Sequence, residues 1–185
     1  MLQDRLKWNK KYQTANYSNN PATIVKQFAN LAAGKKALDI AAGNGRNALF
    51  LADQGFEVDA VDISEAGLML FAGKNPGIHA MCVDLDDFDI PANHYDLIIN
   101  IKYLNRRLFS YIREGLAHGG VLIFQTFLDS PDPGRNQPVC QDYLLRENEL
   151  LHTFLSLKIV RYTESIEKAG DEVTQLASLV GIRDS

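Results

Sequence analysis

The sequence predicts an α/β protein with a doubly wound, mostly parallel sheet and helices on both of its faces. Strand-length apolar runs alternate with helical segments between residues 35 and 127, a pattern typical of parallel strands joined by crossover helices. Residues 95–101 are almost entirely apolar, as expected for a strand covered on both faces. Near the end of the chain, the runs 157–162 and 173–182 flank Gly170-Asp171, which predicts a hairpin with one antiparallel strand. The expected total is seven strands.

Two helices should precede the first strand. Residues 2–12 are expected to form a short amphipathic helix. Asn19 or Asn20 can cap a second helix with Pro21 at its first position, and Gly34 should stop it. The apolar face of this second helix would consist of Ile24, Val25, Phe28 and Leu31.

The central elements follow in strand–helix order. Residues 35–41 are expected to form a buried strand, 45–54 a helix and 56–62 a second strand. The helix 45–54 should turn Leu49, Phe50 and Ala52 inward. Ser64 can cap the next helix, which should reach residue 73 or 74.

The second half is expected to add three strands before the hairpin strands, over residues 78–83, 95–101 and 121–127. A helix over 104–117 should be closed by Gly119-Gly120. Three prolines and a glycine predict a loop over 128–141, and residues 144–154 should be helical.

Composition narrows the range of functions. A chain of 185 residues is long enough for one core, so we expect a single domain over residues 1–185. The net charge of −4 argues against a non-specific nucleic-acid or membrane binder. Cys82 is expected in the core and Cys140 in a loop; without metal-ligand spacing or a disulfide pattern, they favour no metal site and a reducing, cytoplasmic setting. No signal peptide or membrane span is expected.

A glycine loop follows the first predicted strand. Gly43-Asn44-Gly45 opens a helix, where glycines permit positive φ and close approach of a ligand. The spacing Gly43-x-Gly45-x-x-Ala48 also fits a dinucleotide fingerprint, and a tight turn alone could require the glycines. Asp62 ends the second strand, where an acid can accept hydrogen bonds from ribose hydroxyls of NAD or another nucleoside ligand.

Asp39 distinguishes the possible ligands. It lies inside the strand, four residues before the first glycine. A pyrophosphate site uses backbone N–H groups and a helix N-terminus, and has no use for a carboxylate there. S-adenosylmethionine carries a sulfonium and an α-ammonium and no phosphate, so its charge suits Asp39.

The sequence resembles the class I S-adenosylmethionine-dependent methyltransferases, most closely their small tellurite-resistance-type branch. The resemblance is carried by ALDIAAGNGRNALFLADQGFEVDAVDIS (37–64), VDLDDFDIP (83–91), YDLIIN (95–100) and GGVLIFQTF (119–127). It implies a Rossmann-like seven-stranded fold, S-adenosylmethionine as the cofactor with S-adenosylhomocysteine as the product, and residues 1–33 as a helical segment that closes over the cofactor.

The resemblance also implies roles for particular residues. Asp39, Gly43 and Gly45 would hold the methionine end, Asp62 the ribose, and Asp84 the adenine amino group. The full set of expected cofactor residues is Asp39, Ala41, Gly43, Gly45, Arg46, Asn47, Asp62, Ile63, Asp84, Leu85, Asn100 and Ile101.

Acceptor residues are expected at the carboxyl ends of the strands and in the N-terminal segment. The candidates are Trp8, Tyr12, Tyr103, Arg106, Phe127 and Arg135, with the loop 128–145 near the acceptor; each also has an ordinary reading as packing or solvated charge. No residue is identified as a catalytic base. NIKY stands where amino-methyltransferases carry an N/D-P-P-Y/F motif, which favours a small-molecule acceptor. A protein or RNA acceptor, an NAD-dependent oxidoreductase and a non-catalytic cofactor-binding protein remain alternatives, as do a monomer and a homodimer.

Overall fold

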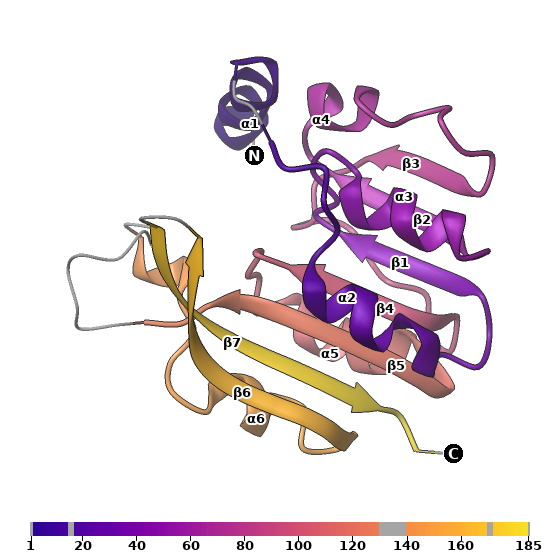
Figure 1. The fold of residues 1–185 in the computed structure, drawn as a ribbon, viewed down its shortest axis with the longest axis vertical. Coiled ribbons are helices and arrows are strands. Elements are labelled where there is room, and N and C mark those ends of the chain that lie inside the picture. Colours follow the sequence, from indigo (N-terminus) through magenta and orange to yellow (C-terminus); the bar gives the residue numbers. More distant parts are fainter. Residues whose placement is uncertain (1, 15–16, 130–139, 170–171, 185) are drawn as a thin grey trace.

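The computed structural model describes residues 2–14, 17–129, 140–169 and 172–184. Within these residues, seven strands form one sheet in the order β3-β2-β1-β4-β5-β7-β6 (Figure 1). Neighbours among β1 to β5 pair in parallel, whereas β7 is antiparallel to both β5 and β6. The strands are β1 (Lys36–Ile40), β2 (Glu57–Asp62), β3 (Ile78–Cys82), β4 (Tyr95–Ile101), β5 (Leu116–Phe127), β6 (Lys158–Ala169) and β7 (Glu172–Ile182). The predicted fold class is confirmed.

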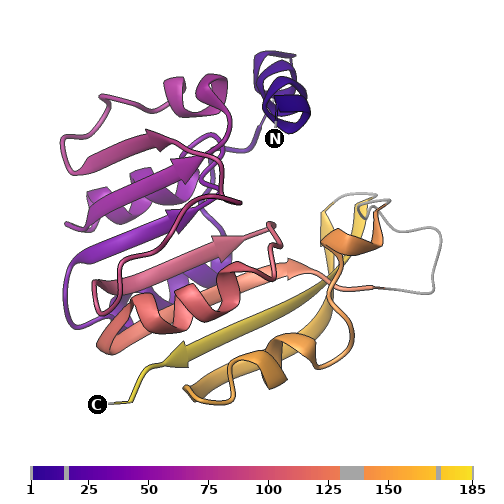
Figure 2. The same cartoon turned by 180° about the vertical axis from the view of Figure 1, so that it is seen from behind.

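Helices cover both faces of the sheet. The helical elements are α1 (Leu2–Thr14), α2 (Thr23–Phe28), η1 (Ala29–Leu31), α3 (Arg46–Asp53), α4 (Glu65–Met69), α5 (Leu108–Gly115), η2 (Gln141–Tyr143) and α6 (Glu149–Thr153). Apolar side chains of α2, α3 and α4 pack into one core cluster. Those of α5 and α6 pack into a second cluster on the opposite face, which is turned forward in Figure 2.

The strand order reverses between β1 and β4. From β1 the sheet continues to β2 and β3, and from β4 it continues to β5, β7 and β6. In open α/β sheets, ligands bind beyond the carboxyl ends of the strands at such a reversal. Ala41 directly follows β1 with φ 56° and Lys102 directly follows β4 with φ 60°. Left-handed backbone at non-glycine residues costs about 1–3 kcal/mol and is concentrated at functional sites. Ala41 and Lys102 therefore place backbone strain after both strands that flank the reversal.

The N-terminal helices differ in part from the prediction. The helix predicted over residues 2–12 is found as α1, which extends to Thr14, and none of its residues is fully buried. The second helix begins at Thr23 and has no side-chain cap, so the caps predicted at Asn19 or Asn20 are wrong. The N–H of Ala22 instead donates to Oδ1 of Asn47, 2.9 Å away in α3. A distant side chain therefore replaces the local cap.

The burial predicted for α3 is confirmed in part, and that predicted for Cys82 is wrong. In α3 the residues Leu49, Phe50 and Ala52 pack against the core but are only partly covered, while Ala48 and Leu51 are the fully buried apolar residues. Cys82 is exposed because β3 is the edge strand, with a neighbour on one side only.

The junction between α5 and β5 was placed too late. The helix ends at Gly115 and β5 begins at Leu116, so Gly119 and Gly120 lie within the strand rather than closing a helix. Gly119 has φ 74°, and a Cβ at Gly120 would lie 2.9 Å from the Tyr95 carbonyl oxygen. The glycines therefore permit a kink and a close backbone approach.

The predicted helix 144–154 is reduced to α6, preceded by an extended segment in which Leu145 bridges Leu128. Residues 130–139 of the proline-containing loop and the turn at Gly170-Asp171 lie outside the described residues. Across the described part of the chain, every helix is too short or too polar to cross a bilayer.

Candidate functional site

The glycine loop after β1 has the backbone that its sequence predicts. Gly43 has φ 59° and Gly45 has φ 74°, a region that side chains other than glycine rarely adopt. A Cβ at Gly45 would collide with the ring of Phe71, and one at Gly43 would collide with the hydroxyl of Tyr12. Both glycines are therefore required by conformation and by space.

Asp39 lies in β1 beneath this loop and is 1% exposed. Its carboxylate accepts a hydrogen bond from the N–H of Ala48, in the first turn of α3. Gly45 precedes α3 and cannot supply a side-chain cap, so Asp39 performs this task from the strand. Its Oδ2 is buried and has no hydrogen-bond partner in the part of the chain that the structure describes.

The charge of Asp39 is poorly compensated. Burial, together with the nearby carboxylate of Asp62, raises the pKa of Asp39 to about 8, against the Arg46 guanidinium and the Ala48 N–H, which lower it. An ionised carboxylate without full pairing is costly in such a place. A cation near Oδ2 would therefore stabilise the ionised form of Asp39.

Asp62 links the glycine loop to the start of α4. Its Oδ2 accepts from the N–H of Gly43 and its Oδ1 from the N–H of Ser64, both at 2.8 Å. Burial raises the pKa of Asp62, against these two hydrogen bonds. Ser64 caps α4 as predicted, accepting from the N–H of Gly67 at 3.1 Å.

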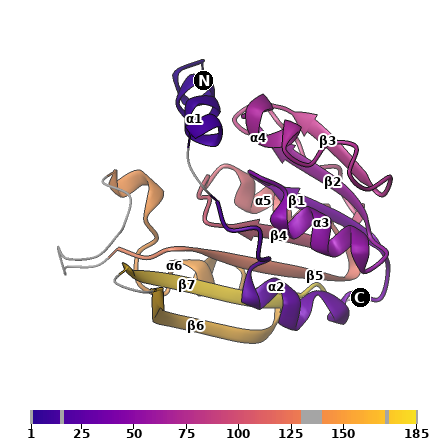
Figure 3. The same cartoon turned by 45° about the horizontal axis from the view of Figure 1, so that its top comes forward.

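Helix α1 covers this corner of the sheet (Figure 3). Oδ1 of Asn9 accepts from Oγ of Ser64 at 2.8 Å and from the N–H of Ala66 at 3.1 Å, which fastens α1 to α4. The Tyr12 side chain lies against both Gly43 and Gly67. Burial raises the pKa of Tyr12, and the charge of Asp62 adds to the effect.

Of the two aromatic residues predicted at the acceptor, Tyr12 thus lies at the glycine loop, and Trp8 lies beside Tyr12. The Trp8 and Tyr12 rings are 6.0 Å apart at the centroids, and the Tyr12 and Tyr17 rings are 4.7 Å apart. The three rings form one aromatic group around Tyr12.

Polar side chains of the loop hold the chain that follows α1. Nδ2 of Asn44 donates to the carbonyl of Ser18 at 3.1 Å and to Oδ1 of Asn19 at 3.3 Å. An Arg46 N–H donates to the carbonyl of Asn20 at 3.4 Å. The roles of Asn9 and Asn44 are not predictable from the sequence, because a single amide in a polar segment gives no signal of a distant partner.

The other predicted cofactor residues lie around the same edge. Ile63 is half-buried after β2, and Asp84 follows β3 with its Oδ1 accepting from the N–H of Asp86 at 3.1 Å. Leu85 is 4% exposed and packs into the core, so a ligand would meet its backbone. Asn100 is buried at the end of β4 and donates to the Tyr103 carbonyl at 2.7 Å, and Ile101 is buried beside it.

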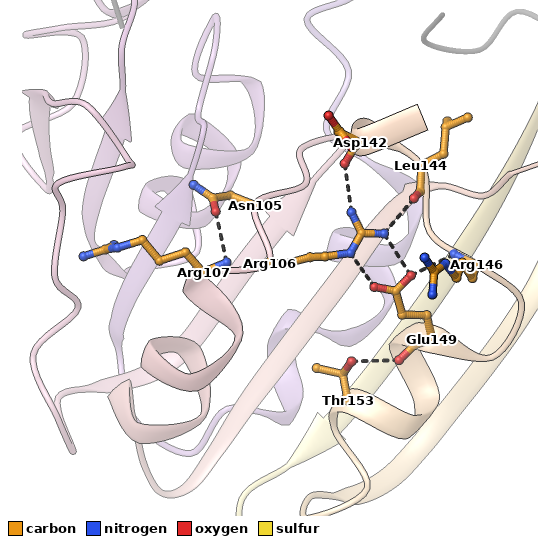
Figure 4. A network of polar contacts seen from close by, with 8 residues as sticks. All are labelled: Asn105, Arg106, Arg107, Asp142, Leu144, Arg146, Glu149 and Thr153. Atoms are coloured by element: carbon orange, nitrogen blue, oxygen red, sulfur yellow. Dashed lines mark hydrogen bonds and ion pairs between the residues drawn. The ribbon is translucent and has the colours of Figure 1, made fainter. Parts of the chain in front are cut away.

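Arg106 belongs to a polar network between α5 and α6 (Figure 4). Its guanidinium donates to both carboxylate oxygens of Glu149, at 2.6 and 2.9 Å, and to the carbonyls of Asp142 and Leu144, each at 2.9 Å. These contacts lower the pKa of the Glu149 carboxyl. They commit most of the Arg106 donors to protein partners, which favours a structural role.

A cavity of about 340 Å³ adjoins this network and is lined by Arg106, Asp129, Gln141, Asp142, Leu144 and Arg146. It lies within the predicted acceptor region 128–145. None of the glycine-loop residues lines this cavity. The cavity is therefore separate from the site formed by Asp39, Asp62 and the glycine loop.

The remaining acceptor candidates are spread along that edge. Burial raises the pKa of Tyr103 to about 12, with Asn105 donating to its hydroxyl. Phe127 ends β5, with the Lys102 ammonium 6.0 Å from its ring centroid. Arg135 lies outside the described residues.

Solved structures with similar folds support this architecture. TehB from Haemophilus influenzae has a TM-score of 0.76 and 21% identity, over 97% of this chain and 67% of that chain. An S-adenosylmethionine-dependent methyltransferase from Mesorhizobium loti has a TM-score of 0.70 and 17% identity, over 90% and 100%. A geranyl diphosphate C-methyltransferase from Streptomyces coelicolor A3(2), in complex with Mg²⁺, geranyl diphosphate and S-adenosyl-L-homocysteine, has a TM-score of 0.63 and 14% identity, over 86% and 76%. At these identities the likeness establishes the fold alone.

Comparison by sequence identifies the family. No curated protein matches the chain significantly. The sequence model of the family described as tellurite resistance protein TehB matches residues 1–173. Since this match spans most of the chain, the protein belongs to the TehB family.

Proposed function

We propose that this protein binds S-adenosylmethionine at the crevice between β1 and β4 and transfers its methyl group to a small-molecule acceptor. One observation carries the proposal: Oδ2 of Asp39 is buried and unpaired beside Asp62, beneath a glycine loop. A phosphate-bearing dinucleotide would place negative charge near these carboxylates, whereas S-adenosylmethionine brings a sulfonium and an ammonium. The residues therefore fit this cofactor better than NAD.

Each part of the cofactor has candidate partners. Asp39, Gly43 and Gly45 would hold the methionine end, and Arg46 and Asn47 support the loop from α3. Asp62 accepts backbone hydrogen bonds from Gly43, Ser64 and Ile63, and the four lone-pair sites of its carboxylate leave room for a ribose hydroxyl. The adenine would lie near Ile63, Asp84 and Leu85, with Asn100 and Ile101 bordering the methionine portion. The family and the methyltransferase folds support this assignment.

The cofactor supplies a methyl group on a positively charged sulfur, which is open to in-line attack. What remains for the protein is to align the reactants and exclude water, and alignment alone can contribute roughly 7–11 kcal/mol. The raised pKa of Tyr103 keeps its phenol protonated near neutral pH, so it is not a base there. This favours acceptors that are soft or already deprotonated.

Two observations favour a small acceptor over RNA. The Arg106 guanidinium is engaged by Glu149, and that of Arg107 donates to Asp89 at 2.6 Å. The basic pair is thus largely neutralised by neighbouring carboxylates. In addition, NIKY at residues 100–103 stands where amino-methyltransferases of DNA and many of RNA carry an N/D-P-P-Y/F motif.

Ligand-dependent stabilisation tests the cofactor assignment. S-adenosylmethionine and S-adenosylhomocysteine should raise the melting temperature, and NAD should not. Asp39→Asn should weaken the shift strongly, whereas the matched control Asp87→Asn, in an exposed loop, should preserve it. A larger shift with NAD than with S-adenosylmethionine would refute the assignment.

A second assay separates an enzyme from a binding protein. Labelled S-adenosylmethionine would be incubated with thiols, amines and oxyanions, and transfer of the labelled methyl group measured. Turnover with any of these acceptors supports catalysis. Cofactor binding without turnover across the panel favours a non-catalytic role.

A further inference from the structure

The groups proposed to bind the cofactor are covered in this structure. Asp39 is 1% exposed and Asp62 is 6% exposed, and Gly43 and Gly45 are buried as well. A ligand needs direct contact with these carboxylates and with this backbone, whereas even water scarcely reaches them. A part of the chain that covers them must therefore move before the ligand binds.

The Tyr12 side chain covers this loop. A Cβ at Gly43 would collide with the tyrosine hydroxyl, and a Cβ at Gly67 would lie 3.0 and 3.1 Å from two carbons of its ring. The phenol also interacts electrostatically with Asp62 and Asp39. Tyr12 therefore fills the space that the missing side chain of Gly43 leaves open, which is where a ligand approaches the backbone of such a loop.

Helix α1, which carries Tyr12, is held in this position by modest forces. None of its residues is fully buried. Oδ1 of Asn9 fastens it to α4 through Ser64 and Ala66, at 2.8 and 3.1 Å. A helix of 13 residues has little stability of its own, and elements with few buried apolar contacts open at low cost. Helix α1 can therefore leave the loop while the sheet stays folded.

We propose that α1 is an autoinhibitory gate, in which Tyr12 occupies the place of the ligand and Asn9 holds the gate closed. S-adenosylmethionine and Tyr12 then compete for the space in front of Gly43 and Asp62. Only molecules in which α1 has moved away can bind, so their fraction sets the apparent affinity. This inference rests on the proposed function.

Disabling the gate should tighten the binding of S-adenosylmethionine. Titration calorimetry would measure the Kd for the wild type, for Tyr12→Ala, which empties the space, and for Asn9→Ala, which removes the bonds to α4. We expect each variant to lower the Kd about tenfold. That factor corresponds to about 1.4 kcal/mol, the size of one to two hydrogen bonds.

Leu6→Ala is the matched control, because Leu6 lies on the same helix and is 61% exposed; its Kd should stay within twofold of the wild-type value. Urea unfolding checks that each variant is folded, and if Tyr12→Ala is not, Asn9→Ala decides alone because it keeps the tyrosine. An unchanged or raised Kd in either folded variant would overturn the inference while leaving the proposed function intact. Failure of the wild type and of both variants to bind S-adenosylmethionine would overturn the proposed function as well, whereas binding by the variants alone would support both.

Discussion

Replacing Asp39 by Asn should stabilise the protein without ligand while impairing ligand binding. Asparagine has the same shape and can still accept from the N–H of Ala48. It removes a charge that is buried, lies near Asp62 and has an unpaired oxygen. The gain in the free energy of unfolding should depend on pH in a defined way.

The sign follows from proton linkage. The pKa of Asp39 is raised from 3.8 to about 8 in the folded protein, so between these values the native state binds the proton and the unfolded state does not. Stability of the wild type therefore falls as pH rises through this window. Each pKa unit corresponds to about 1.4 kcal/mol, so above pH 8 the gain in the free energy of unfolding for Asp39→Asn has an upper limit of roughly 6 kcal/mol. Structural relaxation and water penetration lower the cost of the buried charge, and we therefore expect a gain of about 2–4 kcal/mol.

Urea unfolding at half-unit steps from pH 5 to pH 9 would measure this difference. The stability gap between Asp39→Asn and the wild type should widen by about 1.4 kcal/mol per pH unit below the folded-state pKa of Asp39 and level off above it. Asp87→Asn should give a curve parallel to the wild type. A constant gap for Asp39→Asn, or a gap that narrows with rising pH, would refute the account of Asp39 as a buried, undercompensated acid.

Three further predictions concern the contacts around the site. Arg106→Lys should lower the free energy of unfolding by about 1 kcal/mol, because an ammonium cannot reproduce the forked contact with Glu149. The same loss measured in a Glu149→Gln background would show that it does not come from the Arg106–Glu149 pair. Asn9→Ala should cost about 1 kcal/mol by removing the hydrogen bonds that Asn9 Oδ1 accepts from Ser64 Oγ and the Ala66 N–H, and it should speed proteolysis near α1; unchanged cleavage would contradict the fastening of α1. Gly45→Ala should destabilise by more than 1 kcal/mol, since the methyl group would meet the Phe71 ring at positive φ. Thermal unfolding of that variant would reveal a wild-type melting temperature if the predicted clash were wrong.

The sequence predicted the fold where local pattern and tertiary environment agree. The strand 95–101 is found at those residues because continuous apolar character suits a central strand. The end of α5 was misplaced because Gly119-Gly120 resembles a helix stop, while here the pair lies inside β5 beside Tyr95. Short-range rules cannot distinguish these two uses of glycine.

The candidate site shows the same division. Asp39 could be identified because an acid inside an apolar strand before glycines departs from the local pattern, and Asp62 because an acid ends the next strand. Asn9 could not, since its partners are 55 and 57 residues away. The cap of α2 was misassigned for a similar reason: Asn47, 25 residues later, takes the part expected of Asn19 or Asn20.

The position of Asp39 explains why the loop and the N-terminal segment form one unit. Its carboxylate caps α3, which begins with the residues whose side chains hold residues 20–22. Helix capping alone would be served equally well by a neutral asparagine, without the energetic cost of burying a charge. The cost is understandable if the second oxygen meets a cation, because interactions reserved for a ligand are commonly left unsatisfied in its absence. A ligand bearing an ammonium would then satisfy the acid in β1 whose other oxygen supports the helix that anchors the N-terminal segment.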